Sequence, residues 1–265
     1  MWITISPEPI ECTADFDVVA ESDDWIVVDK PAPLIVHPAN NKNEPNLLEG
    51  VGSLLCFEMA TGGMLGLINR LDRETSGLSL VAKNVSMARE LGKAMQRHEI
   101  HKQYYALVYG CPGWLEHDCQ LPIIRKGEIT HSDIYVKQVV HTQGKPCHTK
   151  FTRLRSFDTT KGLFSLIKCQ PITGRMHQIR VHLAELGHPI VGDKIYGPNE
   201  NHYLDFIQHG WSAEMESDLL LRRQALHAYK LSFPYDGETI TLEIGLPKDI
   251  QSFLDTHLIT KKGIE

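Results

Sequence analysis

The chain has 265 residues, of which 42% are hydrophobic, and a formal net charge of -6 at pH 7. No apolar run reaches the roughly 18 residues of a membrane-spanning helix, and the acidic N-terminus lacks the basic start of a signal peptide, so we expect a cytoplasmic protein. The six cysteines contain no C-x-x-C pair, which favours reduced thiols over a disulfide framework or a zinc knuckle.

The acidic charge is concentrated at the N-terminus. Residues 1–24 hold seven acidic side chains and no Lys or Arg, which leaves 27 basic and 26 acidic side chains in the other 241 residues. Association depends on the local field more than on the total charge, so a nearly neutral body can still carry a basic surface. The net charge therefore does not exclude a nucleic-acid partner.

Strands and helices follow one another through the first half of the chain. The expected elements are a short strand within residues 1–24, a strand over 25–30, a helix from Leu47, a strand over 78–82, a helix after residue 84 and a strand over 104–109. Asn46 can cap the first of these helices, and Asn84 or Ser86 can cap the second.

The second half is predicted to be richer in strands. Gly and Pro residues between 110 and 144 indicate hairpins. They are followed by strands over 149–154 and 163–168 and by a helix that opens at Thr173 or Gly174, with Gly187 as its C′ residue. A helical insertion is expected within 199–222. The last strands are expected over 229–233 and 239–244, joined through Asp236-Gly237. This irregular order predicts an α+β fold with a mainly antiparallel mixed sheet and flanking helices. We expect one main domain over 25–258, an acidic extension over 1–24 and a tail over 259–265.

The segment Asn69–Gly77 places a carboxylate, Asp72, between Arg70 and Arg73 among turn-forming residues. Nearby cations favour the ionised form of a carboxyl group. Such an anion can act as a nucleophile or a base, while the arginines can hold a phosphate-rich substrate. The alternative is that Asp72 only caps a turn and the arginines only solvate it.

Two further segments carry complementary chemistry. Tyr104 follows Lys102 in a predicted strand; a tyrosine can stack on an unstacked base and offers a phenol for proton transfer, although strand tyrosines commonly pack in cores. Arg175 lies near a predicted helix start, where backbone amides favour anions. Arg180 can pair with Asp72 if it points toward it, and is otherwise a solvated surface charge.

A metal or nucleotide site has weaker support. His177, His182, His188 and Asp193 are close in sequence, but His177 and His182 are five residues apart, and such positions diverge on a helix, unlike the i and i+4 pair of a zinc helix. The glycines of Thr61–Gly66 match neither a P-loop nor a dinucleotide fingerprint. We therefore expect no metal and no cofactor.

Taken together, the chain resembles the RluA family of pseudouridine synthases from about Asp24 to Pro247. The segments that carry the resemblance are WIVVDKPAPLIVHP at 25–38, RLDRETSG at 70–77, KQYYA at 102–106, PITGRMHQIRVHLAELGHPIVGDKIYG at 171–197 and LHA at 226–228. The family usually begins the second of these motifs with histidine, whereas this chain has Asn69, which can hydrogen-bond but cannot titrate near neutrality. Many relatives carry an S4-type RNA-binding domain first, and 24 residues are too few for one.

The resemblance implies a pseudouridine synthase fold with a central RNA-binding cleft, and an isomerase that converts uridine in RNA to pseudouridine. Asp72 would be the catalytic carboxylate, either attacking the ribose or removing a sugar proton. Tyr104 would stack on the uracil and Arg180 would pair with Asp72. The residues expected to contact the substrate are Arg70, which would help to extrude the base, and Arg73, Lys102, Arg175 and His177.

The implied partner is a structured stem-loop of tRNA or large-subunit rRNA, bound by a monomer. Without an appended domain, recognition is expected to involve residues 111–146 and 199–222. Two rivals from other classes are a non-catalytic RNA-binding protein, which would leave uridine unmodified, and a metal-dependent hydrolase, which would be inhibited by a chelator.

Overall fold

The chain divides into two compact units. Unit 1 contains residues 1–102 and 228–245, and unit 2 contains residues 103–227 and 246–265. The computed structural model describes residues 15–37 and 44–257. The sequence prediction of one main domain stays a prediction. The boundaries predicted at 24/25 and 258/259 stay predictions, and the predicted tail lies outside the described residues.

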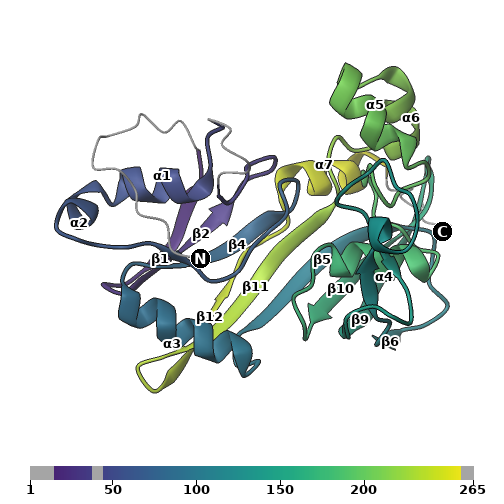
Figure 1. The fold of residues 1–265 in the computed structure, drawn as a ribbon. Coiled ribbons are helices and arrows are strands. Elements are labelled where there is room, and N and C mark those ends of the chain that lie inside the picture. Colours follow the sequence, from purple (N-terminus) through teal and green to yellow (C-terminus); the bar gives the residue numbers. More distant parts are fainter. Residues whose placement is uncertain (1–14, 38–43, 258–265) are drawn as a thin grey trace, which may run out of the picture. The chain divides into compact units, whose positions relative to one another are not determined.

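Unit 1 is a sheet with helices packed on it (Figure 1). Its strands are β1 (Asp17–Glu21), β2 (Trp25–Lys30), β3 (Gly66–Leu67), β4 (Ser76–Ala82), β11 (Leu226–Tyr235, from residue 228) and β12 (Glu238–Glu243). They are ordered β1-β2-β4-β11, with β3 on β4 and β12 on β11. The pairs β1–β2, β2–β4, β3–β4 and β11–β12 are antiparallel, and β1, inside the predicted N-terminal extension, is part of this sheet.

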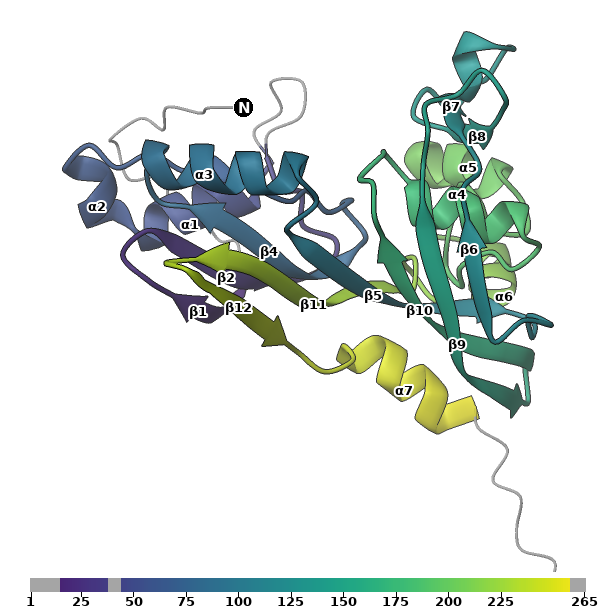
Figure 2. The same cartoon turned by 90° about the horizontal axis from the view of Figure 1, so that it is seen from below.

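The helices of unit 1 begin at the predicted caps. They are α1 (Leu47–Leu54), α2 (Cys56–Ala60) and α3 (Val85–Gln96), and Figure 2 shows α1 and α3 on the same side of the sheet. Asn46 accepts a hydrogen bond from Glu49 N, and Asn84 accepts one from Met87 N. The apolar face of α3 packs through Met87 and Leu91 on a buried cluster that includes Trp25, Leu80 and Phe233.

Unit 2 contains a second run of strands, ordered β5-β10-β9-β6, and a separate β7–β8 hairpin. The strands are β5 (His101–Tyr109, from residue 103), β6 (Glu116–Cys119), β7 (Ile123–Arg125), β8 (Gln138–Val140), β9 (Thr149–Thr159) and β10 (Gly162–Pro171), and a 3-10 turn, η1 (Lys126–Glu128), follows β7. All the adjacent pairs in this order are antiparallel. Together with unit 1, this confirms the predicted α+β fold with a mainly antiparallel sheet.

Four helices complete unit 2: α4 (Gln178–Glu185), α5 (Asn201–His209), α6 (Ala213–Leu219) and α7 (Lys248–His257). Helices α5 and α6 confirm the predicted helical insertion. Gly187 follows α4 with φ +80, as predicted for its C′ residue. The predicted start of α4 at Thr173 or Gly174 is wrong, because the chain first forms a loop that is hydrogen-bonded to the side chain of Gln178.

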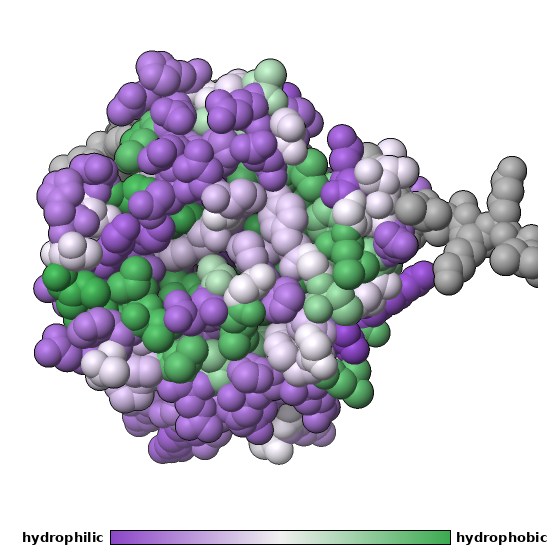
Figure 3. Space-filling model, turned by 90° about the vertical axis from the view of Figure 1, so that its right-hand side faces the viewer, coloured by the Kyte–Doolittle hydropathy of each residue, from purple (hydrophilic) through white to green (hydrophobic). Residues whose placement is uncertain are grey.

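Hydrophobic residues share the surface with hydrophilic ones. On the face that Figure 3 shows, hydrophobic residues lie between areas of hydrophilic residues. The most exposed large apolar side chains of unit 2 include Leu115 and Ile207, at 64% and 60% exposure; Leu115 lies in the loop before β6 and Ile207 lies on α5. Within the described part of the chain, no helix combines the length and the apolar character needed to cross a membrane.

Gly77 allows β4 to approach β11 closely within unit 1. Its φ is +113, and a Cβ atom there would lie 2.3 Å from the carbonyl oxygen of Ala228. Gly162 has a similar φ of +116, but a Cβ atom there would meet nothing within 4 Å. The two glycines therefore share backbone strain and differ in steric contact.

We expect Gly77→Ala to lower the free energy of unfolding by at least about 2 kcal/mol, since both strain and overlap result. The matched control Gly162→Ala carries the strain alone and should cost about 1 kcal/mol. Urea denaturation followed by circular dichroism measures both. Equal losses would show that the contact between β4 and β11 is not tight.

Candidate active site

Asn69 anchors the loop that carries Asp72. Its buried side chain donates from Nδ2 to the Leu78 carbonyl oxygen at 3.0 Å and accepts at Oδ1 from the Leu80 amide at 2.7 Å. Both polar atoms of the amide are thus satisfied by β4. Asn69 therefore fixes the base of the loop through hydrogen bonds that need no titratable group.

Lys30 holds the other side of this loop. Its side chain has no exposed surface, and Nζ donates to the carbonyl oxygens of Pro31, Leu34 and Arg73 at 2.9, 2.8 and 3.2 Å. A buried ammonium needs such acceptors, because an uncompensated charge is costly to remove from water. Lys30 therefore ties the proline-rich loop after β2 to the residue that follows Asp72. Sequence analysis missed this role, although a lysine at the end of an apolar strand was a signal for it.

Three of the four charged residues of the loop, Arg70, Asp72 and Arg73, are predicted site residues, and all of them belong to unit 1. Asp72 is partly exposed, and its carbonyl oxygen accepts a hydrogen bond from Thr75 N at 3.1 Å, which closes a turn. Arg73 pairs with Glu44 at 2.5 Å, with both side chains substantially exposed. Arg70 is exposed, and no ion pair or hydrogen bond joins it to another described residue. The loop thus presents an anion and two cations at a fixed base.

Lys102 and Tyr104 lie on β5, at the point where the chain passes from unit 1 to unit 2. They are two positions apart, so their side chains leave the strand on the same face. Lys102 Nζ lies 3.7 Å from Met95 Sδ, and burial lowers the pKa of this lysine. Tyr104 is buried and pairs across the sheet with Cys169 of β10.

The loop before α4 is held by one buried amide. Gln178 Oε1 accepts from Thr173 Oγ1 and Arg175 N at 2.7 and 3.0 Å, while Nε2 donates to His148 O and Thr149 Oγ1. All four hydrogen-bonding sites of the amide, two lone pairs and two protons, are thereby used. Arg175 is exposed on this loop, and the next predicted substrate residue, His177, ends it.

Arg180 forms a buried ion pair within unit 2. Its Nε and Nη2 atoms donate to the two oxygens of Asp193 at 2.7 and 2.9 Å, and Asp193 has no exposed surface. Burial would raise the pKa of Asp193, but Arg180 and the backbone amides of Tyr196 and Ile195 together hold it below its ordinary value. Sequence analysis missed Asp193 as the partner. The predicted pairing of Arg180 with Asp72 of unit 1 stays a prediction.

The residues weighed as metal ligands have other partners. His182 bonds Thr149 Oγ1 and the Leu121 carbonyl oxygen at 3.0 and 2.8 Å, and His188 Nδ1 lies 3.1 Å from the Tyr109 carbonyl oxygen. Burial lowers the pKa of His182, which favours its neutral form. Among the residues that the structure describes, no three His, Cys, Asp or Glu side chains are grouped so as to hold a metal ion.

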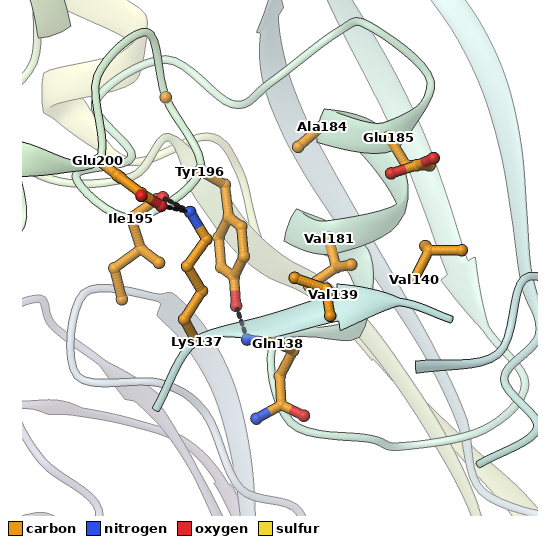
Figure 4. Close-up of a pocket in the computed structure, with 11 residues that line it drawn as sticks. Lys137, Gln138, Val139, Val140, Val181, Ala184, Glu185, Ile195, Tyr196 and Glu200 are labelled. Carbon is orange, nitrogen blue, oxygen red and sulfur yellow. Dashed lines mark hydrogen bonds and ion pairs between the residues drawn. The ribbon is translucent and has the colours of Figure 1, made fainter. Parts of the chain in front are cut away.

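Unit 2 has an open pocket of about 380 Å³ between β8, α4 and residues 195–200 (Figure 4). Val139, Val181 and Ile195 give it apolar walls, and Lys137 is paired with Glu200 at its edge. None of the predicted site residues lines this pocket. Tyr196 does, and its hydroxyl group reaches both β8 and His177.

Comparison with known proteins identifies the family. The family model described as RNA pseudouridylate synthase matches residues 24–185. Ribosomal large subunit pseudouridine synthase D of Neisseria meningitidis serogroup B is 36% identical over 94% of this chain, which spans 62% of that relative's length. An uncharacterized RNA pseudouridine synthase of Bacillus subtilis, YlyB, is 32% identical over 94% of this chain and 76% of its own length.

Solved structures share the fold. The structure of human RNA pseudouridylate synthase domain containing 1 superposes with a TM-score of 0.68 at 24% identity, covering 94% of this chain and 92% of the other. That of human RNA pseudouridylate synthase domain containing 4 gives a TM-score of 0.69 at 22% identity, covering 92% and 95%. At these identities the likeness establishes the fold alone.

We expect Asn69→Ala to lower the free energy of unfolding by about 2 kcal/mol, because a buried carbonyl and a buried amide lose their partners. The control is Asn199→Ala, which removes one exposed hydrogen bond to the Asn201 amide and should cost less than about 0.5 kcal/mol. Chemical denaturation measures both changes. A loss in the Asn69 variant no larger than in the control would contradict the anchoring role.

We expect Asp193→Asn to lower the free energy of unfolding by about 3 kcal/mol at pH 7, because it breaks a buried pair. The pKa of Asp193 is lower in the folded than in the unfolded protein, where it is about 3.9, so the pair stabilises the fold above about pH 4. This stabilisation is lost as the pH falls through the folded pKa. The difference between wild type and variant should therefore shrink below about pH 4 in urea titrations.

Asp249→Asn is the matched control for that experiment. Asp249 also accepts two hydrogen bonds from an arginine, Arg223, within unit 2, but its side chain is 43% exposed. Because solvent screens it, its substitution should cost less than that of Asp193 at pH 7. Equal costs would contradict the importance we give to burial.

Proposed function

Because this chain belongs to the RNA pseudouridylate synthase family, we propose that it isomerises specific uridines in RNA to pseudouridine. The reaction breaks the N-glycosidic bond, turns the uracil and rejoins it to the ribose through carbon. No group enters or leaves overall, so the reaction requires neither a redox cofactor nor a metal. The proposal rests chiefly on the family match over residues 24–185, which includes the whole Asp72 loop.

Asp72 is the proposed catalytic carboxylate. Its role is supported by the loop described above, whose base is fixed by Asn69 and Lys30 while the Asp72 side chain is partly exposed. A carboxylate held in this way needs little reorganisation before it acts. It can attack the ribose as a nucleophile or remove a sugar proton as a base, and both routes begin from the ionised form.

Tyr104 and Arg180 are proposed to complete the catalytic group. Tyr104 would stack on the uracil and assist the proton transfer that follows rejoining. Arg180 would pair with Asp72 while remaining bonded to Asp193, since a guanidinium has five N–H donors and can serve two carboxylates.

The other predicted site residues are proposed to contact the RNA. Arg70 would help to extrude the target base, a step that costs a few kcal/mol in a stacked nucleotide. Arg73, Lys102 and Arg175 would contact phosphates, and His177 would offer a hydrogen bond. Contacts of this kind position the RNA and do not read its sequence.

Large-subunit ribosomal RNA is the first substrate to test, because a similar protein of Neisseria meningitidis is named for that RNA. A tRNA stem-loop is the second. We propose that the enzyme works as a cytoplasmic monomer and that residues 111–146 and 199–222 contribute to RNA recognition.

The decisive experiment is Asp72→Asn. We expect pseudouridine formation in ribosomal RNA transcripts, mapped with carbodiimide, to fall on the order of 1000-fold or more, while RNA binding and the melting temperature change little. Asp158→Asn, at an exposed acid of β9, is the control and should keep wild-type activity. Retained turnover in the Asp72 variant would refute the assignment. Binding without any modification by the wild-type protein would favour the non-catalytic RNA-binding alternative.

A further inference from the structure

Tyr196 links three segments of unit 2. It is largely buried, and its hydroxyl oxygen lies 2.8 Å from His177 Nδ1. The same oxygen lies 2.9 Å from the backbone nitrogen of Gln138 at the start of β8 (Figure 4). The guanidinium carbon of Arg180 lies 5.0 Å from the centre of its ring. Tyr196 therefore contacts two predicted site residues and the β7–β8 hairpin at once.

The hydrogen bonds at this hydroxyl favour one direction. The backbone N–H of Gln138 can only donate, so the Tyr196 oxygen accepts that bond. This leaves the phenol proton available to donate to His177 Nδ1, which lies at hydrogen-bond distance. A neutral imidazole that accepts at Nδ1 carries its proton on Nε2. Donation from Tyr196 to Nδ1 therefore requires the tautomer of His177 in which Nε2 is the donor.

The backbone of His177 supports a positioning role. Its φ is +57, in the left-handed region that non-glycine residues rarely adopt. Such a conformation persists where surrounding contacts enforce it, and it recurs at functional sites. Here the bond from the Arg175 amide to the Gln178 side chain fixes the chain two residues before His177, and the Tyr196 hydroxyl contacts the His177 ring.

Tyr196 is itself fixed to the Arg180 ion pair. Its backbone amide donates to Asp193 Oδ1 at 3.1 Å, and the amide of Ile195 donates to the same oxygen at 3.0 Å. The carboxylate that holds Arg180 therefore also holds the chain at Tyr196. The positions of Arg180 and His177 are linked through Asp193 and Tyr196.

We propose that Tyr196 is a positioning residue for RNA recognition, which orients His177 and keeps the imidazole proton on Nε2 as a hydrogen-bond donor to an oxygen of the RNA. This proposal rests on the proposed function for its RNA partner. The assignment of the tautomer does not depend on any activity, so the two can fail separately.

The tautomer is tested first, by ¹⁵N-edited NMR of the full-length wild-type protein. The chain has 14 histidines, so the His177 signals are assigned by their loss in His177→Gln. In the wild-type protein we expect the NMR signals of His177 to be those of a neutral ring protonated at Nε2. In Tyr196→Phe we expect a mixture of the two tautomers. A His177 ring protonated at Nδ1 in the wild-type protein would overturn the proposal. This measurement does not require the Tyr196 variant to fold.

The function of the contact is tested by kinetics on the RNA that the wild-type protein modifies. We expect Tyr196→Phe to raise KM about fivefold with a smaller change in kcat, the size expected for one hydrogen bond. In a His177→Gln background the same substitution should have little further effect, because it acts through His177. An undiminished effect in that background, or an unchanged KM, would overturn the proposal.

Tyr109→Phe is the matched control. Tyr109 is a tyrosine of unit 2 whose hydroxyl donates to the Asp218 carbonyl oxygen at 2.8 Å, and it takes no part in the proposed site. The Tyr109→Phe substitution should leave the tautomer of His177 and the KM for the RNA unchanged. If wild-type protein modifies no RNA while His177 is protonated at Nε2, the proposed function fails and the tautomer assignment stands.

Discussion

The buried charge of Asp193 constrains much of unit 2. A carboxylate without exposed surface must be compensated, and four hydrogen bonds do this here: two from Arg180 and two from the amides of Ile195 and Tyr196. The amides can point at Asp193 only if residues 193–196 form a tight turn. Because Arg180 lies on α4, that turn is also fixed to the helix. One ionised group therefore orients both a helix and a loop, through an ion pair between residues that are 13 positions apart in the sequence.

Unit 1 uses the same physical principle with the opposite charge. The ammonium of Lys30 is surrounded by backbone carbonyls, one of them from Arg73, and Asn69 satisfies two further backbone groups of β4. In both units, polar side chains inside the protein hold a loop. Arg70 and Arg73, which are proposed to meet RNA, lie on the loop of unit 1, and His177 contacts Tyr196 of the loop of unit 2. Backbone groups are suitable anchors because their positions are set by the sheet.

The sequence was most informative where structure depends on neighbouring residues. The apolar strand at Trp25–Lys30 and the caps Asn46 and Asn84 were predicted from local pattern, and the structure confirms them. The start of α4 was not predictable in this way, since it depends on His148 and Thr149, about thirty residues from Gln178. The motif around Asp72 could likewise be found, but not the buried partner of Arg180, because spacing alone does not distinguish one acid from another.

The division of unit 1 between two distant stretches of the chain has a consequence for its synthesis. Strand β4, which follows the Asp72 loop, has β11 as a neighbour, and β11 contributes Ala228 opposite Gly77. During translation, the edge of β4 stays without this neighbour until about 150 further residues have been made. Residues 103–227, which lie between, form most of unit 2 and can fold in the meantime. The nascent chain thus completes the sheet that carries its Asp72 loop only after residues 103–227 have been made, and β4 is an open edge for unwanted strand pairing until then.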